Sequence, residues 1–84
     1  MKLKKRGKFT KTENRIIQFL QEYNKVITRE ELFKEIFKSE FYNYRLIDVH
    51  INRIRKKIND KNKQIIKTVR GIGYKWNLKD KKEN

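Results

Sequence analysis

The 84-residue sequence contains no cysteine and no proline, and it has only three glycines, one histidine and one serine. Without cysteine the chain has no disulfide, no thiolate zinc site and no cysteine nucleophile, which is compatible with a reducing compartment. No apolar run approaches the length of a membrane span, and no signal peptide is visible. These absences favour a cytoplasmic protein with no membrane association.

The polar residues do not form a recognisable catalytic or metal-binding pattern. The single histidine, His50, lies among cations, and the three Asp and seven Glu are scattered without metal-ligand spacing. The G-x-G at residues 71–73 follows a strand-like run but does not precede a helix, as a phosphate-binding loop would require. We therefore expect a protein that is not an enzyme and that has no cofactor and no metal site.

Acidic residues are also scarce, and the resulting charge is localised. Ten Asp and Glu stand against 24 Lys and Arg, for a net charge of +14. Residues 1–12 carry six bases and no acid, and residues 45–84 carry thirteen bases against four acids, whereas residues 13–44 are nearly balanced. Localised positive charge favours a polyanionic partner, nucleic acid before an anionic membrane surface.

Three helices are expected from capping signals and apolar spacing. Thr10 with Glu13, and Thr28 with Glu31, each form the Thr-x-x-Glu pattern of a capping box. The buried faces expected for these two helices are Ile16, Ile17, Leu20 and Tyr23 in the first, and Leu32, Phe33, Ile36 and Phe37 in the second. A third helix is predicted over about residues 44–59, because isoleucines recur four, three and four residues apart at Ile47, Ile51, Ile54 and Ile58.

A β-hairpin is predicted at the C-terminal end of the chain. Strand-like runs at residues 65–69 and 74–78 flank Gly71 and Gly73, which supply the backbone freedom of a tight reversal. The β-branched segment 25–28 is expected to add a short third strand to the same sheet. The order helix, short strand, helix, helix, hairpin predicts an α+β fold, the winged helix-turn-helix.

The face of the third helix opposite the isoleucines favours DNA over a merely solvated surface. It carries a bare Val49 among Arg45, Asn52, Arg53 and Lys56. In a major groove, Val49 can contact a thymine methyl, and an arginine can pair with guanine. Asp48 can orient an arginine or accept from a cytosine amino group, and Asn52 can pair with adenine or bind a phosphate. Arg70 at the hairpin tip suits a minor groove, although an ordinary exposed hairpin would also carry an arginine.

Four segments resemble, in order and spacing, the effector domain of OmpR/PhoB-type response regulators. They are FTKTENRIIQFL, VITREELFKEIF, RLIDVHINRIRKKI and IKTVRGIGYKW, and the resemblance covers roughly residues 9–77. It implies a winged-helix transcription regulator of a two-component system that binds double-stranded DNA, often as two copies on tandem direct repeats. The implied base contacts are Asp48, Val49 and Arg53. The implied phosphate contacts are Arg45, His50, Asn52, Arg55, Lys56 and Thr68, and Arg70 takes the minor-groove role of the wing.

The resemblance also suggests a protein contact. The family's loop between the second and third helices can contact RNA polymerase, and the corresponding residues here are Glu40, Phe41, Tyr42 and Asn43. From the residues alone, we expect Phe41 to close the small core, and Tyr42 is left open between the two roles.

The chain departs from the family's pattern at several places. Phe37 and Lys38 stand where the family usually has Trp and Gly, and Asn52 stands where many members have Arg, which weakens one expected phosphate contact. The family's N-terminal four-stranded sheet and its receiver domain do not fit in the eight residues before Phe9. We expect residues 1–8 to be a basic arm or strand stub, residues 9–78 the winged-helix domain and residues 79–84 a charged tail. The chain is then either a fragment or a stand-alone regulator.

Two other functions remain open on the sequence. A small RNA-binding or ribosome-associated protein would fit the charge, with Tyr74 and Trp76 as a stacking surface on one strand, although we expect these two to pack under the wing. A membrane-surface helix would turn the isoleucine stripe toward lipid and leave the other helices without a core.

Overall fold

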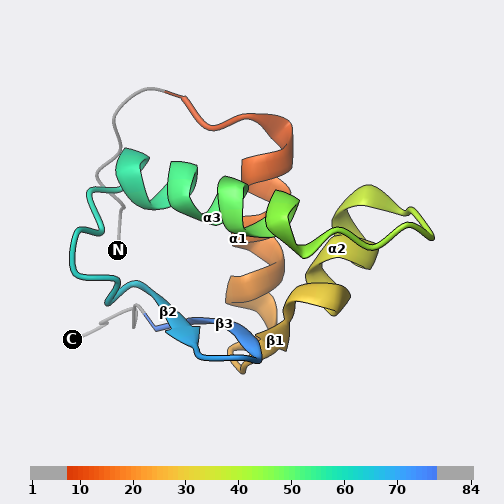
Figure 1. Cartoon of the computed structure of the whole chain (residues 1–84). Coiled ribbons are helices and arrows are strands. Elements are labelled where there is room, and N and C mark those ends of the chain that lie inside the picture. Colours follow the sequence, from red (N-terminus) through yellow and green to blue (C-terminus); the bar gives the residue numbers. More distant parts are fainter. Residues whose placement is uncertain (1–7, 78–84) are drawn as a thin grey trace.

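The computed structural model describes residues 8–77 as three helices and a small antiparallel sheet (Figure 1). The elements follow in the order α1 (Lys11–Tyr23), β1 (Ile27–Thr28), α2 (Arg29–Phe37), α3 (Tyr44–Lys57), β2 (Ile66–Val69) and β3 (Gly73–Trp76). The expected charged tail, Leu78 and all of the expected arm except Lys8 lie outside the described residues.

Both predicted capping boxes are present. The Thr10 backbone amide donates to Glu13 Oε1 at 2.8 Å, and the Glu13 amide donates back to Thr10 Oγ1 at 3.1 Å. Thr28 and Glu31 make the same pair of bonds at 2.9 and 3.0 Å. The two boxes satisfy amides that the first turn of each helix would otherwise leave unpaired, and they fix where α1 and α2 begin.

The isoleucine stripe of α3 is buried as predicted, since Ile47, Ile51, Ile54 and Ile58 all lie in the core. The helix ends at Lys57, two residues before the predicted end, because Asn59 adopts a left-handed conformation with φ of 60°. The buried Asp60 carboxylate then accepts from the backbone amides of Gln64, Ile65 and Ile66. That carboxylate fixes the turn from which β2 starts.

The sheet has the strand order β1-β3-β2, which confirms that the short strand pairs with the hairpin. Ile27 lies opposite Tyr74, and Thr68 lies opposite Tyr74 from the other side. Gly71 has φ of 76° at the turn, as a hairpin glycine is expected to have. Gly73 has a different role, because a Cβ there would lie 2.0 Å from the Ile27 carbonyl oxygen. It lets β1 approach the hairpin.

Most predicted core residues are buried, with three exceptions. Tyr23 is 48% exposed because α1 ends there, and Phe37 is only partly buried. The expectation that Phe41 closes the core is wrong, since it is 87% exposed in the loop between α2 and α3. Tyr74 and Trp76 are buried, as expected for residues that pack under the wing. The arrangement is that of a winged helix, with α3 lying across the front of α1 in Figure 1.

Candidate nucleic-acid interface

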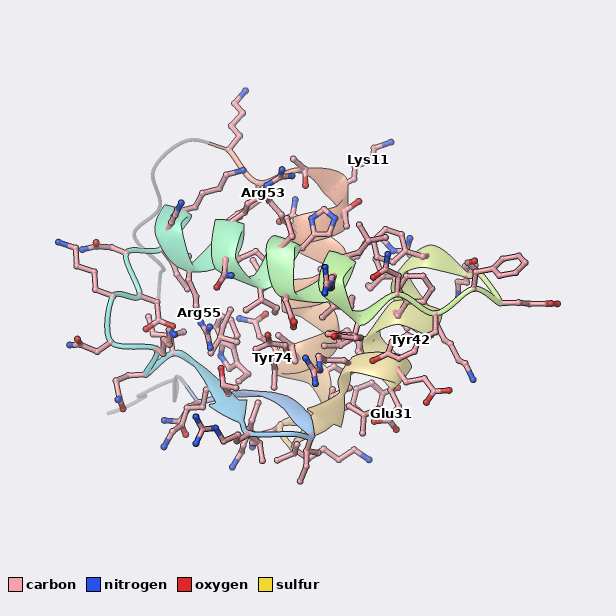
Figure 2. All side chains as sticks on the ribbon, in the orientation of Figure 1. Lys11, Glu31, Tyr42, Arg53, Arg55 and Tyr74 are labelled. Carbon is pink, nitrogen blue, oxygen red and sulfur yellow. The ribbon has the colours of Figure 1, made fainter. Side chains whose placement is uncertain are left out.

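The outer face of α3 is the first part of the candidate interface. Val49 is 44% exposed, and Arg45, Asn52, Arg53 and Lys56 are exposed around it. In Figure 2, Arg53 projects from the side of α3 that faces away from the sheet. Because the isoleucine stripe fills the core, this face is free to enter a groove about as wide as a helix.

The wing supplies a further exposed cation at its tip. Arg70 follows β2 and begins the turn, where the Ile72 amide donates to the Val69 carbonyl at 2.9 Å. Arg70 and Ile72 are both exposed at this tip, and Lys67 is exposed on β2. Thr68 is exposed beside them, and its hydroxyl accepts from Arg55. An arginine on a narrow turn has the shape and charge that a minor groove attracts.

Arg55 differs from the other predicted phosphate contacts. Only 6% of it is exposed, and its guanidinium donates to the Ile66 carbonyl through Nε at 3.2 Å and through Nη2. Nη2 also donates to Thr68 Oγ1 at 2.8 Å. The structure thus uses Arg55 to join α3 to β2 rather than to present a free cation.

Asp48, which the sequence places among the base contacts, is half-buried and already has two partners. Its Oδ1 accepts from the Tyr74 hydroxyl at 2.6 Å, and its Oδ2 accepts from Arg29 Nη1 at 3.1 Å. Arg29 was not among the site residues predicted from the sequence. It is the first residue of α2, its partner lies nineteen residues away, and no local pattern distinguishes it from an ordinary surface arginine.

His50 lies at the edge of the outer face and is partly buried. Its ring is 5.8 Å from the Phe37 ring, and its Nδ1 is buried without a hydrogen-bond partner among the described residues. Burial lowers the pKa of His50, and Arg53 lowers it further, while Glu13 acts in the opposite direction. The neutral imidazole is therefore favoured.

A buried ion pair supports the start of α1 behind this face. Lys57 Nζ, at the end of α3, lies 2.6 Å from Glu13 Oε1, and Glu13 is 2% exposed. Burial raises the pKa of Glu13, but hydrogen bonds from Lys57 and the Thr10 amide outweigh it, and the net pKa is lowered. The pair fixes the C-terminal end of α3 against α1.

The loop between α2 and α3 carries an aromatic surface. Phe41 is almost fully exposed, while Tyr42 makes an edge contact with Phe33 at 5.6 Å between ring centroids. Tyr42 is still 42% exposed, so it contributes both to the core margin and to the surface. Glu40 and Asn43 are exposed on either side, and Asn43 caps α3 by accepting from the Arg45 amide.

Within residues 8–77, no group of three or more His, Asp or Glu residues is placed to hold a metal ion. The helices in the same part of the chain are all too short and too polar to cross a membrane.

A protein-family comparison gives a match over most of the chain. The family described as "Transcriptional regulatory protein, C terminal" matches residues 4–76. The chain is also 42% identical, over 64 residues, to the transcriptional regulatory protein SrrA of Staphylococcus aureus strain NCTC 8325 / PS 47. That match covers 71% of this chain and 27% of SrrA. The chain therefore spans about a quarter of the length of the curated relatives that it matches.

Solved structures of response regulators are also similar to this chain. The response regulator DrrB of Thermotoga maritima, an OmpR/PhoB homologue, has a TM-score of 0.76 and 36% identity, covering 84% of this chain and 34% of DrrB. The DNA-binding domain of the response regulator AdeR, solved with an intercistronic region, has a TM-score of 0.73 and 34% identity. That match covers 84% of this chain and 74% of the AdeR chain.

Proposed function

The chain belongs to the family of C-terminal domains of transcriptional regulatory proteins, the DNA-binding domains of response regulators, and on this premise we propose how it engages DNA. The domain binds double-stranded DNA sequence-specifically, with α3 in the major groove and the hairpin Arg70 in the adjacent minor groove. The family consists of transcription regulators rather than enzymes. The observation that carries the proposal is an exposed Val49 beside Arg53 on a helix whose opposite face is fully buried.

The contacts divide into two classes. Val49 and Arg53 face the base edges, where an apolar side chain and a guanidinium can distinguish base pairs. The cations and polar groups around them hold phosphates and set the register of the helix in the groove. These phosphate contacts are Arg45, His50, Asn52, Lys56 and Thr68.

We further propose that two copies bind tandem direct repeats, with half-sites about one helical turn apart. We expect the domain to be a monomer in free solution and to pair with a second copy on DNA. The exposed Phe41 and Tyr42, with Glu40 and Asn43, form the surface offered to RNA polymerase. An aromatic patch of this kind is typical of protein-contact surfaces.

The RNA-binding alternative loses its main support in the structure. Tyr74 and Trp76, the aromatics that would stack on unpaired bases, are buried beneath the hairpin.

The test is a competition at fixed salt, in which a labelled duplex bound to the chain is displaced by unlabelled duplex or by structured RNA. Duplex DNA should compete better, and log K should fall with log salt at a slope of about −4 to −5 if roughly five phosphates are neutralised. Equal competition by RNA would contradict the proposal.

A further inference from the structure

Three elements that face the proposed DNA site meet at one carboxylate. Asp48 lies in the first turns of α3, Tyr74 lies on β3 of the wing, and Arg29 begins α2. The Tyr74 hydroxyl donates to Asp48 Oδ1 at 2.6 Å, and Arg29 Nη1 donates to Asp48 Oδ2 at 3.1 Å. Each oxygen of the carboxylate therefore has its own partner, and each partner comes from a different element.

In both hydrogen bonds of this cluster the Asp48 carboxylate is the acceptor, and Tyr74 and Arg29 are the donors. Burial raises the pKa of the Tyr74 hydroxyl, and its hydrogen bond to Asp48 raises it further, so the phenol remains a donor. Hydrogen bonds to an ionised carboxylate are shorter and stronger than those between neutral groups. Arg29 also contacts Tyr44, because its guanidinium carbon lies 4.6 Å from the centre of the Tyr44 ring.

A second link between α3 and the wing runs beside the first. Arg55, two turns along α3, donates to Ile66 and Thr68 on β2, and its guanidinium carbon lies 5.5 Å from the centre of the Tyr74 ring. The side of α3 that faces the sheet is thus joined to the wing near both of its ends. Figure 2 shows Arg55 and Tyr74 between α3 and the strands.

We propose that Asp48 is a positioning residue, which through Tyr74 and Arg29 fixes the wing and α2 relative to α3, and thereby couples base preference in the major groove to the minor-groove flank. This inference rests on the function proposed above. If α3 and the wing form one rigid unit, Val49, Arg53 and Arg70 reach their positions together or not at all. Groups that are connected in this way show interaction energies, whereas independent contacts add.

The alternative role of Asp48 is direct recognition of a base, for example by accepting from a cytosine amino group. Both carboxylate oxygens already accept a hydrogen bond from the protein, and the side chain is half-buried. A base contact would have to share an oxygen with Tyr74 or Arg29. A positioning role needs only the two hydrogen bonds that Asp48 already accepts.

The experiment measures binding of the whole chain to four duplexes, built on a site selected from a random library. The duplexes combine the preferred or an altered base pair at the Arg53 position with an A·T-rich or a G·C-rich flank at the Arg70 position. In the wild-type chain, the effects of the two changes on the dissociation constant should be non-additive by a factor of about three or more. In Tyr74→Phe, which removes one hydroxyl and keeps the ring, the non-additivity should fall, and any remainder is attributed to the second link through Arg55. Tyr23→Phe removes an exposed hydroxyl on α1 and should behave as wild type.

A second variant separates positioning from base recognition and serves if Tyr74→Phe fails to fold. Asp48→Asn preserves the shape of the side chain but removes the charge that holds Arg29. We expect it to reduce the non-additivity while leaving base preference unchanged. A changed preference at one base pair, with full non-additivity retained, would show that Asp48 recognises a base and would overturn the inference.

The remaining outcomes distinguish this inference from the proposed function. Sequence-specific binding with additive effects in the wild type would overturn the coupling while the proposed function stands. Non-additivity that persists undiminished in Tyr74→Phe would overturn the positioning role of Asp48 and Tyr74, while the proposed function stands. A chain with no preference for any duplex would overturn both.

Discussion

Arg53 and Arg55 are two residues apart on α3 and lie in opposite environments. Arg53 is exposed on the outer face, whereas the Arg55 guanidinium is buried and lies 2.8 Å from Thr68 Oγ1 on the wing. The run of cations at the end of α3 therefore contains at least two functions. One arginine is free to contact DNA, and the other connects the helix to the hairpin.

The buried role of Arg55 predicts a loss of stability in Arg55→Lys. One ammonium group cannot reproduce the fork that reaches both the Ile66 carbonyl and the Thr68 hydroxyl, so the free energy of unfolding should fall by about 1–3 kcal/mol. Arg53→Lys is the matched control and should change it by less than about 0.5 kcal/mol. Urea denaturation measures both. If Arg55→Lys kept full stability and lost only DNA affinity, the phosphate contact expected from the sequence would be correct.

The two capping boxes predict different responses to the same substitution. Gln can replace Glu in a capping box, so Glu13→Gln and Glu31→Gln both keep the box. Only Glu13 also pairs with Lys57, and only Glu13 is buried. We expect Glu13→Gln to lower the free energy of unfolding by about 1–2 kcal/mol, and Glu31→Gln by less than about 0.5 kcal/mol. Equal losses in thermal or urea unfolding would show that the ion pair contributes nothing.

His50 predicts a fall in stability toward acidic pH. Its pKa is lowered in the folded state from an ordinary value of 6.5, so the unfolded chain binds more protons below about that pH. Stability is then retained above pH 6.5 and is lost as the pH falls through the folded-state pKa. His50→Gln should flatten the free energy of unfolding between pH 7 and the onset of carboxylate titration. An identical pH profile in wild type and variant would show that His50 does not contribute.

Loss of Arg70 and loss of the N-terminal cations should weaken DNA binding in different ways. Arg70→Ala should weaken binding most on A·T-rich flanks, because narrow minor grooves hold the strongest negative potential. Removing residues 2–7 deletes four cations and should weaken binding about equally on all flanks, with a smaller salt slope. Titrations on both flanks at several salt concentrations separate the two. An equal loss on both flanks for Arg70→Ala would make the tip a simple phosphate contact.

Local signals in the sequence predicted the helices, their starts and the hairpin. Thr10 with Glu13, Thr28 with Glu31 and the isoleucine stripe all act within a few residues, so they are visible without a structure. An arginine partner for Asp48 was one of two roles expected for it, but its identity as Arg29 was not predictable, because the two residues are distant in the chain. The bond from Arg55 to the Ile66 carbonyl was not predictable for the same reason. The sequence predicted Gly73 only as a turn residue. Its close approach to Ile27 depends on how β1 packs against the hairpin, which the local sequence does not indicate.

Phe41 was predicted wrongly. An aromatic residue in a small protein is most simply expected in the core, and the residues next to Phe41 do not indicate that it is exposed. The core is already filled by the isoleucines, Phe33 and the two hairpin aromatics, which leaves Phe41 outside.

Selection of bound sequences from a random duplex library, carried out in parallel for the wild type and Arg53→Ala, tests the central claim most directly. The wild type should select a defined motif that occurs twice, as direct repeats about one helical turn apart. Arg53→Ala should remain folded, lose about 1–3 kcal/mol of specific binding and relax the preference at one base pair of each repeat. Ile54→Ala, one residue further on but in the core, should instead destabilise the fold by about 2–5 kcal/mol. If the wild type selects no motif, or if Arg53→Ala selects the wild-type motif unchanged, α3 does not recognise bases as proposed.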